Sequence, residues 1–235
     1  DNSVTLGNDD VTAIYMAEDA GATVYAAGLN LGGTNVTATA EELNLLDGVT
    51  SLTSGATSIN GLSDALVESY SMYIGEDPSA TTSSATYNVA IGKTALGKVT
   101  NGGQNVAVGF NALEENTSGS KNTAVGYQAL ENTTTGSNNT AVGRTSLPFN
   151  TTGGDNVGLG FSALYNNSTG SRNIAIGTSA LGGTNNGESD NLAIGYNSLA
   201  APNSGGEYNV AVGNNALRQN TSGDYNVGVG YNSLN

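Results

Sequence analysis

Apolar and small residues alternate in one short phrase that is repeated nine times along the chain. The phrase is N-x-[AG]-[VIL]-G-x-x-[AS]-L, and successive copies start 17 or 18 residues apart. A fixed period of this length is typical of a solenoid, in which each repeat forms one coil and contacts its neighbours. We therefore predict an all-β fold, a parallel β-roll or β-solenoid with coils of about 17 residues. The copies begin at Asn88, Asn105, Asn122, Asn139, Asn156, Asn173, Asn191, Asn209 and Asn226.

Within one repeat the starting Asn is numbered as position zero. Positions one and three are mostly Val, Ile or Leu, and position two is Ala or Gly, as in Val106, Ala107 and Val108. This alternation predicts a strand with branched residues on one face and small ones on the other. A small residue at position two indicates that another backbone or a neighbouring chain comes close. The Ala/Ser-Leu pair at positions seven and eight predicts a second short strand whose Leu returns to the interior, and the rest is loop.

Position four is Gly in every copy. Glycine there suits a positive φ or crowding at a tight corner. The structural corner glycines predicted in this way are Gly92, Gly109, Gly126, Gly143, Gly160, Gly177, Gly195, Gly213 and Gly230.

Three segments are expected along the chain. Residues 1–36 alternate β-prone residues with turn residues, so they predict a short β-rich shaft segment, and Gly28, Gly32 and Gly33 are expected to interrupt any regular element near its end. Residues 37–67 form a connector with a short helical turn, and a short helix is expected over 61–70. Residues 68–235 form the roll, with Ser71 to Gly75 as a degenerate tenth repeat that caps it.

The composition argues against an enzyme. The chain has no Cys and no His, which removes thiolate chemistry, the usual general base and the commonest metal ligand. The carboxylates of the repeats lie at loop positions or loop edges, without an apolar pocket that would raise a pKa. Asn8, Asp9 and Asp10 lack the spacing of a known calcium loop. We predict no catalytic residue, no cofactor and no metal site.

Charge and hydropathy exclude two classes of partner. The net charge is −14, and the segment before Lys93 contains 12 acidic residues and no basic one. An acidic surface repels phosphate backbones, so nucleic acid is not expected as a partner. No apolar run approaches the ~20 residues of a membrane helix, so no membrane insertion is expected. Both ends of the sequence look like cut points, which suggests a piece of a longer protein.

Two stretches resemble known families. T-A-T-A-E-E-L-N-L-L-D-G-V-T, from Thr37 to Thr50, resembles a segment of bacteriophage tail-fibre proteins that links β-rich shaft units of a homotrimer. N-V-A-V-G-F-N-A-L, from Asn105 to Leu113, resembles the head repeats of YadA-type trimeric autotransporter adhesins, although the period here is longer. The second resemblance implies a left-handed parallel roll, three of which pack side by side. Together they imply a homotrimeric rod.

These resemblances imply a structural or adhesive segment of a phage tail fibre, located on the virion and involved in host-cell attachment. Its expected partners are itself, other virion tail proteins and a host surface glycan or outer-membrane receptor. The alternative is the head of a trimeric adhesin on the bacterial outer surface. An ice-binding solenoid and a capsule-degrading tailspike are minor alternatives.

Position five, directly after the corner glycine, is aromatic in five repeats. Rings at regular spacing could stack on receptor sugars, but regular positions in a repeat more often serve packing, here between subunits. The packing interpretation is favoured. The five candidate receptor-binding residues are Phe110, Tyr127, Phe161, Tyr196 and Tyr231.

Overall fold

The computed structural model describes residues 29–31, 34–36, 65–68, 70–75, 84–183, 187–201 and 206–235. The chain divides into two units, Asp1–Ser51 and Leu52–Asn235. In the first unit, β1 (Leu29–Leu31) pairs antiparallel with β2 (Thr34–Val36). β1 ends directly before Gly32 and β2 begins directly after Gly33, and the two glycines themselves lie outside the described residues. The expected strands before residue 28 and the connector's helical turn lie outside the described residues.

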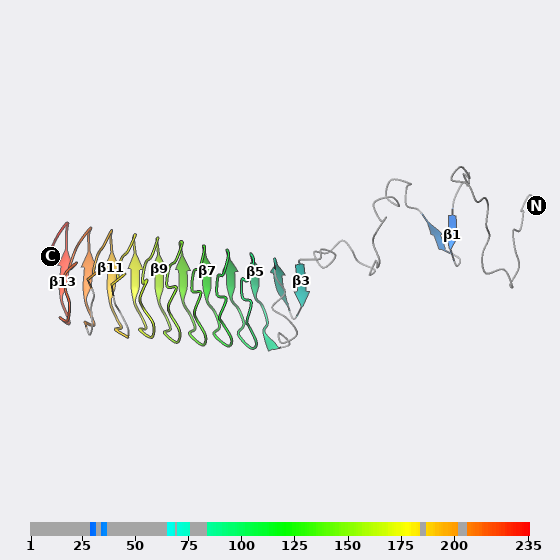
Figure 1. The fold of residues 1–235 in the computed structure, drawn as a ribbon, viewed down its shortest axis with the longest axis horizontal. Coiled ribbons are helices and arrows are strands. Elements are labelled where there is room, and N and C mark those ends of the chain that lie inside the picture. The colour runs from blue at the N-terminus through cyan, green and yellow to red at the C-terminus, as the bar shows by residue number, and fades with distance from the viewer. Residues whose placement is uncertain are drawn as a thin grey trace, which may run out of the picture. The chain divides into compact units, whose positions relative to one another are not determined.

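The second unit is built on one sheet of eleven strands, which follow one another in sequence order (Figure 1). β3 (Ala65–Glu68) pairs antiparallel with β4 (Ser71–Ile74), and from β4 onward each strand pairs in parallel with the next. The parallel strands after β4 are β5 (Val89–Ile91), β6 (Val106–Val108), β7 (Thr123–Val125), β8 (Thr140–Val142), β9 (Val157–Leu159), β10 (Ile174–Ile176), β11 (Leu192–Ile194), β12 (Val210–Val212) and β13 (Val227–Val229).

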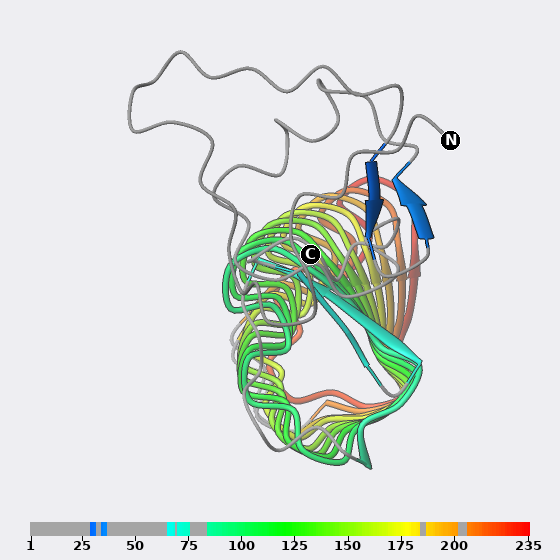
Figure 2. The same cartoon turned by 90° about the vertical axis from the view of Figure 1, so that its right-hand side faces the viewer.

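The predicted parallel β-solenoid is confirmed, since one repeat supplies one coil and one strand. The strand registers pair equivalent positions, for example Ala107 with Ala124 and Val108 with Val125. Viewed along the stack, the coils nearly superimpose (Figure 2). All regular structure of the described residues is strand, and no helix occurs among them.

The sheet starts with a hairpin where a helix was expected. The helix over residues 61–70 is wrong, because β3 covers the free edge of β4 with the register Ala65 to Ile74. Satisfying the backbone groups of that edge outweighs a weak helical spacing. The degenerate repeat is confirmed, since Met72 pairs with Val89 and Gly75 has the positive φ of the corner glycines, 122°.

The interior of the coil is lined with small residues and leucine. The Ala of position two is buried in every described copy, and so is the Ala of position seven. The Leu of position eight is buried in all copies but the last, where Leu234 is 65% exposed. A Cβ added to Gly158 would lie 2.2 Å from Leu147 Cδ1 of the preceding coil. The small residue at position two is thus required by a leucine of the same chain. The buried leucines are Leu96, Leu113, Leu130, Leu147, Leu164, Leu181, Leu199 and Leu217.

The Leu of position eight returns to the interior, as expected, but the second short strand does not form. Asn111 and Leu113 have φ values of 56° and 53°, and the equivalent residues of other coils are also left-handed. Two left-handed residues in three break an extended strand. The backbone nevertheless keeps its hydrogen bonds between coils, because Leu113 N–H donates to Ala129 O at 3.1 Å.

Both predicted reasons for the corner glycines are confirmed. Their φ values lie between 123° and 139°. They also stack directly on one another, so that a Cβ on Gly143 would lie 2.5 Å from Gly160 O. Glycine is therefore needed for its backbone conformation and for the close approach of the next coil.

Candidate functional site: the outer face of the sheet

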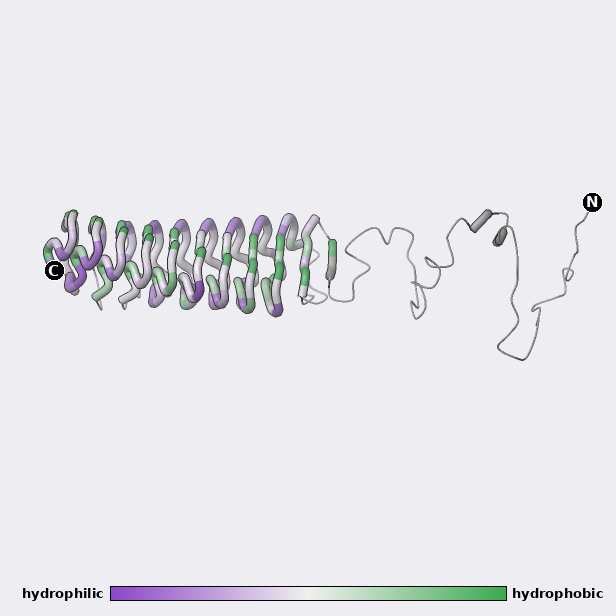
Figure 3. Tube along the Cα trace, turned by 90° about the horizontal axis from the view of Figure 1, so that it is seen from above, coloured by the Kyte–Doolittle hydropathy of each residue, from purple (hydrophilic) through white to green (hydrophobic). Residues whose placement is uncertain are grey.

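The strands turn their larger aliphatic residues outward. In β5 to β13 the middle residue is buried and the two flanking residues, at positions one and three, are half-buried or exposed. Val142, Ile174 and Ile176 are 40%, 38% and 37% exposed. We call positions one and three, with the exposed positions minus one and five that flank them, the outer face. Hydrophobic residues recur at the strands of successive coils (Figure 3).

Position five forms a stack along one border of the outer face. The rings of Phe110 and Tyr127 stack with centroids 5.4 Å apart. Arg144, the position-five residue of the next coil, lies with Cζ 5.6 Å from the ring centroids of both Tyr127 and Phe161. Four consecutive coils are thus joined, and both faces of Tyr127 are covered.

The remaining two candidate aromatic residues do not join this stack. Tyr196 and Tyr231 are separated from it and from each other by Thr178 and Asn214, the position-five residues of the intervening coils. All five rings are exposed, from 41% at Phe110 to 75% at Tyr231. A sugar ring binds by stacking on an aromatic face. Within the position-five stack, the side chains of neighbouring coils already cover such faces.

Position minus one, directly before each starting Asn, forms the other border. Its residues all have φ between 56° and 63°, so their side chains project from a left-handed backbone. Tyr208 and Tyr225 stack with centroids 5.0 Å apart and planes at 2°. Between them and Tyr87 the column is mostly polar and charged.

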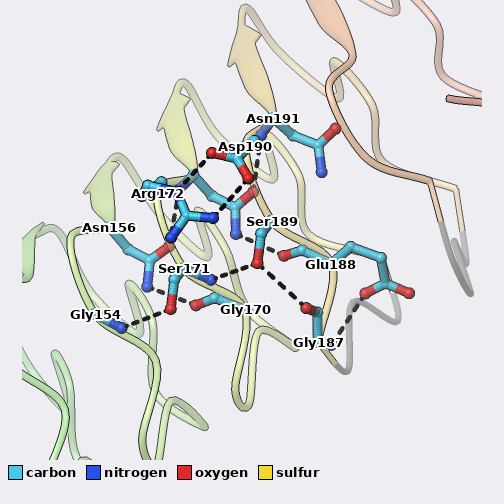
Figure 4. A network of polar contacts seen from close by, with 11 residues as sticks. Gly154, Asn156, Gly170, Ser171, Arg172, Gly187, Glu188, Ser189, Asp190 and Asn191 are labelled. Carbon is cyan, nitrogen blue, oxygen red and sulfur yellow. Dashed lines mark hydrogen bonds and ion pairs between the residues drawn. The ribbon is translucent and has the colours of Figure 1, made fainter. Parts of the chain in front are cut away.

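Arg172 and Asp190 form a two-pronged ion pair in this column, with Nε–Oδ1 2.6 Å and Nη2–Oδ2 2.7 Å (Figure 4). These hydrogen bonds lower the pKa of the Asp190 carboxyl and raise that of the Arg172 guanidinium. The pair joins two successive coils at the surface.

The buried starting asparagines form a ladder of hydrogen bonds that joins each coil to the next. In Asn139 the side-chain Oδ1 accepts Asn156 N–H at 3.0 Å, and Nδ2 donates to Gly153 O at 2.9 Å. Asn156 repeats the pattern with its Nδ2 bonded to Gly170 O at 2.8 Å (Figure 4). The ladder holds each coil at the height of its neighbour and satisfies buried backbone groups.

The loop hydroxyls also bond between coils. Thr117 and Thr134 donate to the carbonyl of the equivalent residue one coil further, at 3.1 Å in both cases. These threonines are half-buried, so they do not present the free hydroxyl row that an ice-binding face would need. Asn116 Nδ2 donates to Gly119 O at 3.0 Å, so the Asn of this Asn-Thr-Ser-Gly loop stabilises its turn.

The described residues contain no group of three or more Asp or Glu side chains arranged to hold a metal ion. A hollow between the loops of the coils that start at Asn191 and Asn209 is lined by Ala200, Ala201, Arg218, Gln219 and Thr221, which include no carboxylate. No helix in the described part is long and apolar enough to cross a membrane.

Comparison with known proteins found no matching family model, no matching curated protein and no matching solved structure. The chain is therefore classified by its fold and its surface. The chain contains a parallel β-solenoid of about 17-residue coils, and its outer face has an aliphatic stripe at positions one and three.

Sequence reasoning found the position-five aromatic residues and the glycines, but it missed three features of the site. It assigned no role to Arg144, to position minus one or to the starting asparagines. Comparing the same position across all repeats would have shown a charged residue within the aromatic column and a polar border opposite it.

Proposed function

We propose that this chain is a structural and adhesive segment of a homotrimeric phage tail fibre that takes part in host-cell attachment. The single observation that carries the proposal is the outer face. Its partners in this role are two further copies of itself, other virion tail proteins and a host surface glycan or outer-membrane receptor. The segment is a left-handed roll preceded by a β-rich shaft, exposed on the virion.

The outer face supports self-association because its central stripe, at positions one and three, is apolar, regular and long. Burying aliphatic surface stabilises by roughly 25 cal/mol per Å², and a contiguous exposed stripe of this kind is uncommon on monomers. Identical copies share the same coil height, about 4.8 Å. Parallel copies therefore match along the whole sheet, so each added coil adds interface.

The rigid stack suits a fibre. Side-chain ladders and backbone bonds join each coil to the next, and such repeats lengthen a rod without changing its cross-section. The tail-fibre-like connector from Thr37 to Thr50 favours the virion. The head of a trimeric bacterial adhesin is the second candidate, which the repeats alone favour.

Packing between copies remains the favoured role of the position-five rings. Because neighbouring rings and Arg144 cover each other's faces, the stack offers a sugar mainly ring edges. Tyr196 is the best candidate for receptor contact, since its neighbours in the column are Thr178 and Asn214.

Antibody labelling separates the two candidates. Antibodies raised against the purified chain would be imaged by electron microscopy on phage particles and on bacteria from the same source culture. Labelling of tail fibres is expected. Labelling confined to the bacterial envelope would overturn the tail-fibre assignment in favour of the adhesin.

A further inference from the structure

We propose that a small aromatic and amide patch outside the outer face binds a neutral pyranose ring. The patch consists of Asn132, Phe149, Tyr165 and Asn166, and we call it the side patch. These residues occupy positions nine and ten of three successive coils, directly after the buried Leu of position eight. The inference rests on the proposed function, in which a host surface glycan is a partner, and it assigns that contact to named residues.

Phe149 differs from the other exposed rings of the described residues. Every other exposed aromatic residue there lies at position minus one or five, on a border of the outer face. Phe149 lies at position ten, five residues beyond the nearest border, and is 44% exposed. Self-association through the outer face therefore does not account for this ring, and an exposed apolar side chain without such a role is a candidate for ligand contact.

Tyr165 orients Phe149 and leaves ring surface open. The two rings form a T-shaped pair, with centroids 5.1 Å apart and planes at 89°. An edge-to-face contact uses the face of only one ring, and only one side of it. At least one face of Phe149 thus stays outside the pair, and the apolar C–H groups of a sugar ring can stack on it.

Two asparagines flank Phe149 in the position-ten column, Asn132 one coil before it and Asn166 one coil after it. Asn132 Nδ2 donates to Pro148 O at 2.7 Å, and Asn166 Nδ2 donates to Gly182 O at 3.0 Å. Both amides are therefore held in the same way, and in the part of the chain that the structure describes neither Oδ1 accepts a hydrogen bond. Sugar hydroxyl groups are donors that match these two acceptors.

The spacing of the two asparagines fits a single sugar ring. Residues two coils apart in one column are separated by about 10 Å along the stack. Two O–H···O hydrogen bonds of about 2.8 Å each take up more than half of this distance. The remaining span of about 4 Å is one that hydroxyl oxygens on different carbons of one pyranose can cover while the ring stacks on Phe149.

Charge selects a neutral sugar, because the side patch contains no charged side chain. The preceding residue, Glu131, is directed to other groups, since its Oε1 accepts hydrogen bonds from Asn111 Nδ2 and Gln128 Nε2, both at 2.8 Å. The net charge of −14 also repels anions at longer range. An uncharged pyranose therefore fits the patch better than a sugar that carries a carboxylate or a phosphate.

Tryptophan reporters in the full chain test the site. The chain has no native Trp, so Phe149→Trp keeps an aromatic face and supplies a single fluorescent probe. Tyr196→Trp is the matched control, because Tyr196 is the best position-five candidate and is 52% exposed. The ligands are methyl β-D-glucopyranoside, methyl β-D-galactopyranoside and methyl α-D-mannopyranoside, with glucuronate as the acidic counterpart. At least one neutral pyranoside is expected to shift the emission of Phe149→Trp only, and glucuronate is expected to bind more weakly.

A second pair of variants tests the ring face itself. Phe149→Leu keeps an apolar side chain but removes the aromatic face, so the dissociation constant of the responding pyranoside is expected to rise at least about fivefold. Tyr196→Leu is expected to leave it unchanged. Saturation-transfer NMR measures both constants, and circular dichroism checks that the two variants melt alike.

The outcomes separate this inference from the proposed function. A response confined to Tyr196→Trp, or stronger binding of glucuronate, would overturn the neutral-sugar site at the side patch. No response in either reporter, in an assembly that keeps the mass of three chains, would overturn the site and leave the fibre role intact. A monomeric chain whose Phe149→Trp emission responds would support the site and overturn the proposed self-association.

Discussion

The two faces of the same sheet reverse the usual distribution of side-chain size. The inner face carries Ala or Gly, which are buried within the coil. The outer face carries Val, Ile and Leu, which remain half-buried or exposed. A chain that functioned alone would gain by burying the larger residues. The difference teaches that the coil closes on its small residues and leaves its large ones at the surface, where the proposed self-association would bury them.

The corner glycines of successive coils lie in close contact, so substitutions there are expected to destabilise the fold most. Gly143→Ala is expected to destabilise far more than Gly230→Ala. Both have a positive φ, for which backbone strain costs about 1–3 kcal/mol, but only Gly143 also faces the next coil, with Gly160 O 2.5 Å from an added Cβ. Urea unfolding followed by circular dichroism measures both. Equal losses would show that crowding contributes nothing.

Two adjacent asparagines allow the buried asparagine ladder to be tested separately from the exposed minus-one column. Asn139→Asp removes an Nδ2 donor from a fully buried site and places a carboxylate beside Gly153 O, so a loss of more than about 3 kcal/mol is expected at neutral pH. Asn138→Asp makes the same change on an exposed residue that tolerates the left-handed backbone, and little loss is expected. Thermal unfolding of the two variants checks this. A comparable loss in both would contradict the ladder.

Neighbouring residues of β8 sharpen the comparison further. Ala141→Val overfills the interior and is expected to cost about 1–3 kcal/mol of folding stability. Val142→Lys should leave the coil folded but lower the mass of the assembly, because a charge enters the apolar stripe. Circular dichroism and light scattering separate the two effects. A Val142→Lys chain with unchanged mass would remove the outer face from the interface.

The smallest effect is expected from the surface ion pair of the outer border. Because Arg172 lowers the pKa of Asp190, the pair stabilises the fold above the ordinary Asp pKa, near 3.9, and this stability is lost as pH falls through the lowered pKa. Asp190→Asn should therefore lower the melting temperature slightly at pH 7 and converge with the parent chain near pH 2. A difference that grows toward pH 2 would contradict the assignment.

The repeat fold could be predicted because its signals lie within single repeats. Alternation at Val106, Ala107 and Val108 predicted the strand and its two faces, and an obligatory Gly109 predicted the corner. The prediction of a second strand was wrong because Leu113 adopts a left-handed backbone conformation, which is rare for leucine. Packing between stacked coils enforces that conformation, and the intrinsic backbone preference of leucine does not predict it.

Other features depend on relations between repeats or on the sheet edge. The starting Asn identified the beginning of each repeat, but a single repeat does not show that each starting Asn forms a hydrogen bond with the next one. Arg144 gains its meaning only from Tyr127 and Phe161, one coil on either side. The hairpin of β3 and β4 replaced a helix because the edge of the first parallel strand needs a partner, which local spacing around Leu66 does not show.

The most direct measurement is the solution mass of the full chain by light scattering, in buffer and after denaturation. The account predicts a mass of three chains in buffer, or 3 × 23.5 = 70.5 kDa, falling to one chain on unfolding. A folded species with the mass of a single chain would contradict it. The outer face would then be a stable aliphatic surface of a self-sufficient solenoid.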